Sequence, residues 1–202
     1  MISNCHPIKK IIDVGGAVLG LVFFSPLYLP ITLAVKMESK GPVVVKLDRI
    51  SGGRKIKVYK FRSMVDGAHR MKKDLAHLNE RRDGPLFKIK NDPRLTRVGR
   101  VIRKFRLDEI PQLYNVLKGE MSLVGPRPHE PEEVAAYPEG FRHLPFTKAG
   151  VTGFSQVSGA SSLPFLKELE IDDYYLKNWS VGFDLKIIAK TLWIIFSDPT
   201  AV

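Results

Sequence analysis

One uncharged, apolar segment constrains this chain more than any other feature. Residues 14–35 read VGGAVLGLVFFSPLYLPITLAV and hold no charged side chain. With a rise of about 1.5 Å per residue, a straight helix of this length could cross a hydrocarbon core of about 30 Å. Pro26 and Pro30 interrupt its middle, and a proline inside a helix lacks a backbone donor and clashes with the preceding turn. We therefore expect a sharp bend at Ser25-Pro26, which leaves two arms that are each too short to span a membrane.

The charges that flank this segment favour a helix that enters the membrane and returns to the same side. Lys9 and Lys10 precede the segment, and Lys36 and Lys40 follow it. Because basic flanks tend to remain in the cytoplasm, we expect both ends there. A kinked helix that crosses once is the alternative. A cleaved signal peptide fits poorly, because the apolar run is long, contains two prolines and lacks a clean small-residue cleavage site.

The charge balance narrows the class of partner. The chain has 202 residues, about the size of one domain, with a formal net charge of +11 and a sequence pI of about 9.8. Such an excess favours nucleic acid, an anionic membrane surface or a phosphorylated substrate. The sole cysteine, Cys5, excludes a disulfide framework and a cysteine metal site, and the histidines show no spacing typical of metal ligands.

Several segments have clear secondary-structure patterns. Residues 43–61 predict a β-hairpin with Ser51-Gly52-Gly53 as its turn, and the polar residues 66–80 predict a helix. A second helix is predicted in the basic stretch 88–106, and a strongly apolar one at 183–196. Each of these last two could pack on the core or lie on a membrane surface. The apolar face of the basic helix consists of Val98, Val101, Ile102 and Phe105, and the apolar helix contains Trp193.

The stretch KFRLDEIPQLYNVLKGE at 104–120 places two adjacent carboxylates, Asp108 and Glu109, behind a run of basic residues. Apolar residues at helical spacing follow, and Pro111 is tolerated only in a first turn, so a helix is predicted to begin near the pair. One interpretation is a capping aspartate beside a glutamate that compensates the helix dipole. The other is a reactive pair, because an ionised aspartate among cations suits nucleophilic attack on a phosphoryl group, and its neighbour suits proton transfer.

Two loops have features that suit anion binding. Arg127 lies between two prolines in GEMSLVGPRPHEP, and the restricted backbone could aim its guanidinium at a phosphate. The segment KAGVTGFSQVSGASS at 148–162 is rich in glycine and serine. It suits close approach of the backbone to a ligand, or it is a plain surface loop.

Four longer motifs, together with the Ser25-Pro26 helix, resemble a known family. The motifs are VYKFRSM at 58–64, GPLFKIKNDPRLTRVGRVIRKFRLDEIPQLYNVLKGEMSLVGPRP at 84–128, GVTGFSQVSG at 150–159 and DDYYLKNWSVGFDLKIIAKT at 172–191. They resemble the bacterial sugar transferases, the monotopic polyprenyl-phosphate phosphoglycosyltransferases. The resemblance implies transfer of a sugar 1-phosphate from a UDP-sugar to a polyprenyl phosphate such as undecaprenyl phosphate, with release of UMP. This would be the first membrane step of a bacterial surface glycan pathway.

The resemblance also implies an α+β, mostly helical fold. It predicts a re-entrant membrane helix with its flanks at 1–40. A catalytic domain at 41–202 would follow, with a small β-hairpin and amphipathic interfacial helices around a cytoplasmic active site. The expected location is the cytoplasmic face of the bacterial inner membrane, in contact with its lipid. A homodimer is left open, and nucleic acid is not expected as a partner.

By the same resemblance, Asp108 is the nucleophile that forms a covalent phosphosugar intermediate and is a ligand of Mg²⁺, and Glu109 is its partner in catalysis. The chain departs from the family at Ala149 and Ala160, where proline and arginine are common, and this leaves the sugar unassigned. The residues that match motif positions near the substrates are Lys60, Arg103, Arg127, Gly150, Thr152 and Gly153.

Two other functions remain as alternatives. A basic adaptor without enzymatic activity, which binds a membrane or nucleic acid, would explain the net charge but would have no use for paired carboxylates in a basic setting. A direct glycosyltransferase would release UDP instead of UMP.

Overall fold

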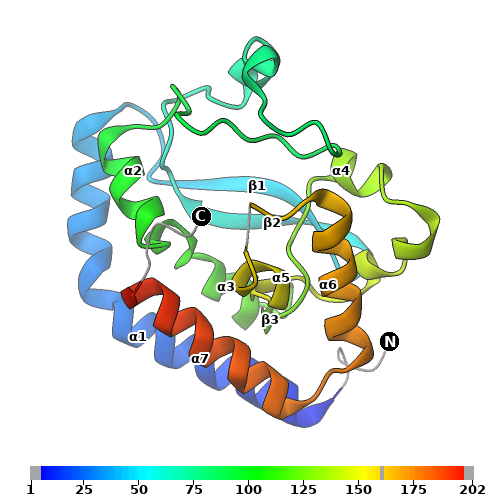
Figure 1. Cartoon of the computed structure of the whole chain (residues 1–202). Helices are drawn as coiled ribbons and strands as arrows, with labels where there is room; N and C mark the ends of the chain where they lie inside the picture. Colours follow the sequence, from blue (N-terminus) through cyan, green and yellow to red (C-terminus); the bar gives the residue numbers. More distant parts are fainter. Residues whose placement is uncertain (1–5, 160–161, 198–202) are drawn as a thin grey trace.

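The computed structural model describes residues 6–159 and 162–197, which form a mostly helical fold with two small sheets (Figure 1). The helices and strands, in chain order, are α1 (Pro7–Glu38), β1 (Val44–Ser51), β2 (Arg54–Phe61), α2 (Arg97–Lys104), α3 (Gln112–Leu117), β3 (Ser122–Val124), α4 (Pro131–Ala135), β4 (Gly150–Thr152), α5 (Phe154–Val157), α6 (Phe165–Lys177) and α7 (Val181–Ser197). Short 3-10 turns join several of them. The expectation of a mostly helical chain with a small hairpin is confirmed.

The long helix α1 remains helical through both prolines, but it turns a corner. Figure 1 shows one arm that runs beside α7 and a second arm that rises beside α2. The proline at position 26 removes the N–H that would bond the Val22 carbonyl, and the Ser25 hydroxyl donates to that same carbonyl at 2.7 Å. The serine therefore satisfies the acceptor that the proline leaves open. In the described part of the chain, this helix alone is long and apolar enough to cross a membrane, judged by length and composition.

The first arm of α1 is fixed to the protein body by buried charges. Lys9 is only 5% exposed; its Nζ lies 2.7 Å from Asp184 Oδ2 and donates to the Val124 carbonyl at 3.0 Å. Asp13 accepts hydrogen bonds from the Ser122 hydroxyl and from the Leu123 N–H. Lys9 is thus not the free basic flank that the sequence indicated, since its charge is paired inside the protein.

The predicted hairpin is confirmed, with a shorter turn than expected. Strands β1 and β2 pair antiparallel from Val44–Phe61 to Ser51–Arg54, so the turn is Gly52-Gly53 alone. Both glycines have positive φ, at 60° and 73°, which a two-residue hairpin turn requires. Ser51 is instead a buried link: its hydroxyl donates to the Glu120 carbonyl and accepts from the Ala149 N–H.

The glycine-rich segment is not a surface loop. It contributes β4, which pairs parallel with β3 in the register Ser122–Gly150 and Val124–Thr152. A Cβ on Gly150 would lie 2.2 Å from the Gly125 nitrogen, so only glycine fits against this neighbouring backbone.

The predicted helix at 66–80 is wrong. The structure has only two 3-10 turns there, Arg70–Lys72 and Ala76–Leu78, and neither contains a buried residue. A short polar segment without an apolar face gains little from packing, and nucleation of a helix is costly. The segment therefore follows the surface as a series of turns.

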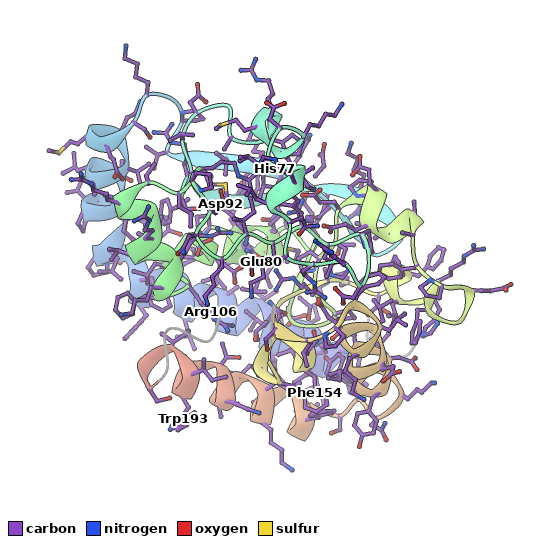
Figure 2. All side chains as sticks on the ribbon, turned by 45° about the horizontal axis from the view of Figure 1, so that its top comes forward. His77, Glu80, Asp92, Arg106, Phe154 and Trp193 are labelled. Atoms are coloured by element: carbon purple, nitrogen blue, oxygen red, sulfur yellow. The ribbon has the colours of Figure 1, made fainter. Side chains whose placement is uncertain are left out.

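The two helices with ambiguous apolar faces each pack on the core and also expose apolar side chains. On α2, Ile102 is buried in the main core, while Val101 is 56% exposed. On α7, Ile187 is buried, while Trp193 is 66% exposed and lies on the outer side of the helix (Figure 2). Each helix thus packs one apolar row on the protein and presents a second row outward.

Candidate active site

The adjacent carboxylates lie in a 3-10 turn, Leu107–Glu109, that precedes α3. The N-cap of α3 is Pro111, and neither this turn nor α3 has a side-chain cap hydrogen bond at its start. The capping interpretation of Asp108 is therefore wrong. Arg106, just before the turn, has φ 54°, a left-handed conformation that non-glycine residues rarely adopt. This strained residue redirects the chain from α2 into the turn that carries the pair.

The hairpin supplies the nearest cation to the pair. The Lys60 ammonium on β2 lies 2.6 Å from Glu109 Oε1 and 4.0 Å from Asp108 Oδ2. Residues from distant parts of the sequence thus meet as one cluster, which contains three of the predicted site residues.

The two carboxylates have different electrostatic environments. Asp108 is 5% exposed, and burial raises its pKa, with the Glu109 charge adding to the effect while Lys60 and Arg103 oppose it. For Glu109, burial also acts upward, but the charge and hydrogen bond of Lys60, together with the charges of Arg127 and Arg106, outweigh it and lower its pKa. The basic neighbours in the sequence favoured an ionised Asp108. The protein alone instead works against its charge, so added positive charge at the site would favour the nucleophilic form.

Two further predicted arginines influence the pair. Arg103 lowers the pKa of Asp108, and Arg127 lowers that of Glu109, after the larger effects of burial and Lys60. Arg103 comes from the last turn of α2, and Arg127 comes from the loop after β3. Both therefore approach the carboxylates from separate elements.

The glycine-rich motif is hydrogen-bonded to the loop that carries Arg127. The Gly150 N–H donates to the Pro126 carbonyl at 2.9 Å, and the Gly125 N–H donates to the Thr152 carbonyl at 3.0 Å. A Cβ on Gly153 would lie 2.2 Å from the Gly125 carbonyl oxygen. In this arrangement Gly150, Thr152 and Gly153 support the backbone next to Arg127.

The two departures from the family pattern have different outcomes. The Ala149 N–H donates to the Ser51 hydroxyl at 2.9 Å, a bond that a proline at this position could not make. Ala160 lies outside the described residues.

A polar network behind Arg127 was not anticipated from the sequence. It centres on Glu168 of α6 and on His129, both buried. The available signal was a helical face on which Glu168 and Asp172 alternate with Phe165 and Leu169, since all four are buried. Carboxylates on an apolar face require internal partners.

The donor set suits a magnesium ion held jointly with substrate. Among the described residues, no group of three or more histidine, cysteine, aspartate or glutamate side chains could hold a metal. Mg²⁺ is commonly bound by one or two carboxylates together with substrate phosphates and waters. Asp108 and Glu109 can supply the carboxylates, so their chemistry fits such an ion.

The chain is similar in sequence to several known proteins. The chain is 38% identical to the galactosyl transferase CpsE of Streptococcus agalactiae serotype III over 93% of its own length and 42% of that protein. It is 38% identical to the undecaprenyl-phosphate galactose phosphotransferase of Salmonella typhimurium, over 93% of this chain and 40% of the relative. It is 37% identical to the exopolysaccharide production protein ExoY of Rhizobium meliloti, over 91% and 83% respectively.

The chain thus spans about two-fifths of the length of the larger curated relatives and most of the length of ExoY. The model of the bacterial sugar transferase family matches residues 4–198. This match covers nearly the whole sequence, and the chain belongs to the bacterial sugar transferase family.

Proposed function

We propose that this protein transfers a sugar 1-phosphate from a UDP-sugar to a polyprenyl phosphate and releases UMP. The observation that carries the proposal is the pair of a buried Asp108 and a half-buried Glu109, with Lys60 bonded to Glu109 and close to Asp108. Adjacent carboxylates at a cationic site suit attack on a phosphoryl group and proton transfer. The names of the Salmonella and Rhizobium relatives support a sugar-phosphate transfer and a role in exopolysaccharide production.

The transfer proceeds in two steps. An Asp108 carboxylate oxygen attacks the sugar-linked phosphorus of the donor, an aspartyl–phosphorus bond forms, and the bond to UMP breaks. A phosphate oxygen of the lipid then attacks the same phosphorus and displaces Asp108, which yields the lipid diphosphosugar. Glu109 accepts a proton from the lipid phosphate, and Lys60, Arg103 and Arg127 balance the phosphate charge. Bound Mg²⁺ would neutralise phosphate oxygens and favour the ionised form of Asp108.

The structure suits a lipid acceptor that arrives from the bilayer. We propose that both ends of α1 face the cytoplasm, so that its corner enters the inner membrane and returns. Cysteines introduced singly as Ser3→Cys and Lys40→Cys, in a Cys5→Ser background, should then react only with reagent on the cytoplasmic side. Labelling of position 3 from the periplasm would show a crossing helix.

The mechanism is tested by intact-mass analysis. Wild-type protein incubated with a turnover-competent UDP-sugar and no lipid should gain the mass of the sugar phosphate on the peptide that contains Asp108. Asp108→Asn should lose the adduct and UMP release, and Glu109→Gln should slow turnover by about 10²–10⁴-fold. EDTA should stop the reaction and Mg²⁺ should restore it. No adduct, together with kinetics that require both substrates at once, would reduce Asp108 to a metal ligand.

The nucleotide that is released distinguishes the proposed function from its two alternatives. Release of UDP instead of UMP would indicate a direct glycosyltransferase. Release of neither nucleotide from a panel of UDP-sugars, in the presence of polyprenyl phosphate, would favour the adaptor.

A further inference from the structure

The loop that carries Arg127 is held at two points by one face of α6. The Arg127 backbone N–H donates to Asp172 Oδ2 at 3.1 Å, and its side-chain Nε lies 3.7 Å from Glu168 Oε1. Residues 168 and 172 are one helical turn apart, so both acceptors face the loop together. The neighbouring prolines and the Asp172 contact restrict the backbone of Arg127. The Glu168 contact restricts the rotation of its side chain.

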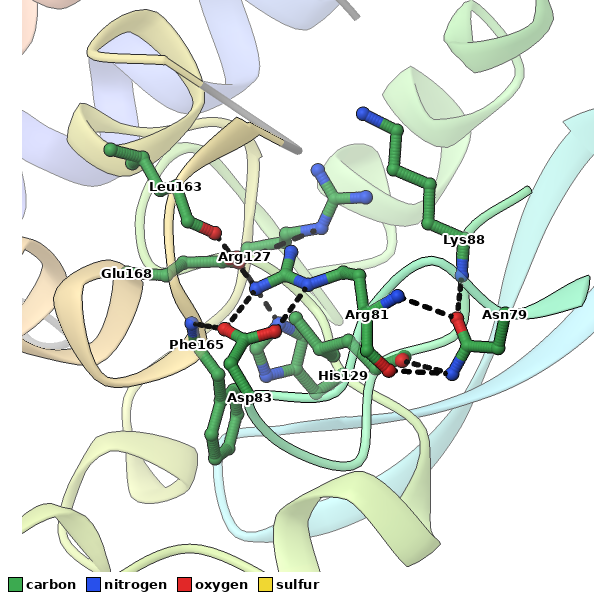
Figure 3. Close-up of polar contacts among 10 residues, drawn as sticks. Asn79, Arg81, Asp83, Lys88, Arg127, His129, Leu163, Phe165 and Glu168 are labelled. Carbon is green, nitrogen blue, oxygen red and sulfur yellow. Dashed lines mark hydrogen bonds and ion pairs between the residues drawn. The ribbon is translucent and has the colours of Figure 1, made fainter. Parts of the chain in front are cut away.

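Glu168 is a buried anion with internal partners. Its side chain is 3% exposed, and its Oε1 also bonds His129 Nε2 at 3.0 Å (Figure 3). His129 Nδ1 lies 2.5 Å from the Tyr137 hydroxyl. Burial would raise the pKa of Glu168, but the His129 hydrogen bond and the charges of Arg127, His129 and Arg81 outweigh it and hold that pKa below its usual range. Glu168 therefore keeps the charge needed to attract a guanidinium.

Arg127 contacts this network and also acts electrostatically on Glu109. Its charge lowers the pKa of Glu168 and also that of Glu109, although its side chain is 41% exposed. Figure 3 shows Nε directed at Glu168 and the two terminal nitrogens directed away from it. A guanidinium held by Nε can offer its outer edge to a phosphate in a bidentate manner.

We propose that Glu168, supported by His129, is a positioning residue that orients Arg127 toward a phosphate group of the substrate. The inference rests on the proposed function, because it assumes that the substrate is a phosphate ester or diphosphate. Glu168 does not touch substrate, and its effect passes through the arginine. If Glu168 only accepted the hydrogen bond of His129 inside the core, its replacement would lower the stability of the fold. It would then have no effect on substrate binding that depends on Arg127.

A double-mutant cycle separates these roles. Full-length protein in detergent is compared as wild type, Glu168→Gln, Arg127→Lys and the double variant, with Glu170→Gln as the matched control. Glu170 lies on the same helix but is exposed and paired with Lys167 on the surface. For each protein, kcat and KM for the UDP-sugar, the melting temperature and calorimetric binding of inorganic pyrophosphate are measured.

We expect Glu168→Gln to lower kcat/KM by about 5-fold, mainly through KM, and to weaken pyrophosphate binding similarly. In the Arg127→Lys background the same change should have no further effect, and Glu170→Gln should match wild type. Should Glu168→Gln melt far below wild type, Glu168→Asp, which keeps the charge but shortens the reach, should show the same kinetic loss. Wild-type kcat/KM in these variants, or additive losses in the double variant, would overturn the inference.

Failure of the proposed function gives a different result. In that case the wild type releases no UMP from any donor, and pyrophosphate binding alone decides the inference. Weaker binding by Glu168→Gln, but not by Glu170→Gln, supports the positioning role. Equal binding by all variants, or no binding by the wild type, refutes it.

Discussion

Replacement of Asp184 by asparagine should weaken the attachment of the first arm of α1 to the protein body. Asp184 is 2% exposed and is the acceptor for three donors: Lys9 Nζ at 2.7 Å, the Tyr175 hydroxyl at 2.6 Å and Trp179 Nε1 at 3.1 Å. These donors come from α1, from α6 and from the connection to α7. One carboxylate thus joins three segments.

The cost follows from the charge that remains. Asparagine keeps one oxygen acceptor but leaves Lys9 as a buried cation without its nearest anion, and removal of one partner of a buried ion pair costs about 3–5 kcal/mol. Asp13 also interacts electrostatically with Lys9 and offsets part of the loss, so we expect the lower end, about 3 kcal/mol. For a chain of this size, that corresponds to a fall in Tm of roughly 10 °C.

Thermal unfolding in detergent micelles measures the effect. Lys9→Met combined with Asp184→Asn should recover much of the lost Tm, because the double variant no longer buries an unpaired charge. Glu170→Gln, which removes an exposed ion pair, should change stability by less than about 0.5 kcal/mol. A Tm for Asp184→Asn within 2–3 °C of wild type (about 1 kcal/mol), or fully additive losses in the double variant, would refute the reasoning.

Three further predictions concern stability and are measured by the same unfolding experiment. Gly99→Ala should cost about 3 kcal/mol, because its Cβ would lie 1.8 Å from a backbone carbonyl oxygen, whereas Gly15→Ala, with nothing within 4 Å, should be neutral or slightly stabilising. Burial raises the pKa of Asp172 to about 6. The protonated form therefore stabilises the fold, and this stability is lost as pH rises from about 4 through 6. Asp172→Asn should remove up to about 3 kcal/mol of this pH dependence of the free energy of unfolding. Ala149→Pro should cost about 1 kcal/mol through its lost hydrogen bond.

Features set by neighbouring residues could be predicted from the sequence. The hairpin follows from two strands rich in branched residues joined by Gly52-Gly53, whose positive φ values need no distant partner. The corner of α1 follows from Ser25-Pro26, because the lost donor and the hydroxyl that replaces it lie within one turn. The carboxylate pair was predicted as a candidate site from its motif and its basic neighbours.

Features set by distant partners could not be predicted. Lys9 was interpreted as a flanking charge because its partner Asp184 lies 175 residues away. The polar segment 66–80 has the composition of a surface helix and of a run of turns alike, and only the lack of a face to bury decides between them. The apolar face that carries Glu168 indicates that its carboxylate needs an internal partner, but it does not indicate that the partner is Arg127, which lies about forty residues earlier.

The two arms of α1 connect the proposed membrane segment to the carboxylate pair by different routes. The first arm is fixed at Lys9 and Asp13 to β3 and α7. The second arm ends at Glu38, whose carboxylate accepts the N–H groups of Arg97 and Val98 at the start of α2. Since α2 leads through Arg106 into the turn that holds the pair, the corner of α1 and the carboxylates belong to one continuous scaffold. In the proposed topology, the depth at which the corner enters the bilayer would therefore set the height of Asp108 above it, and the lipid phosphate would reach Asp108 from the membrane surface.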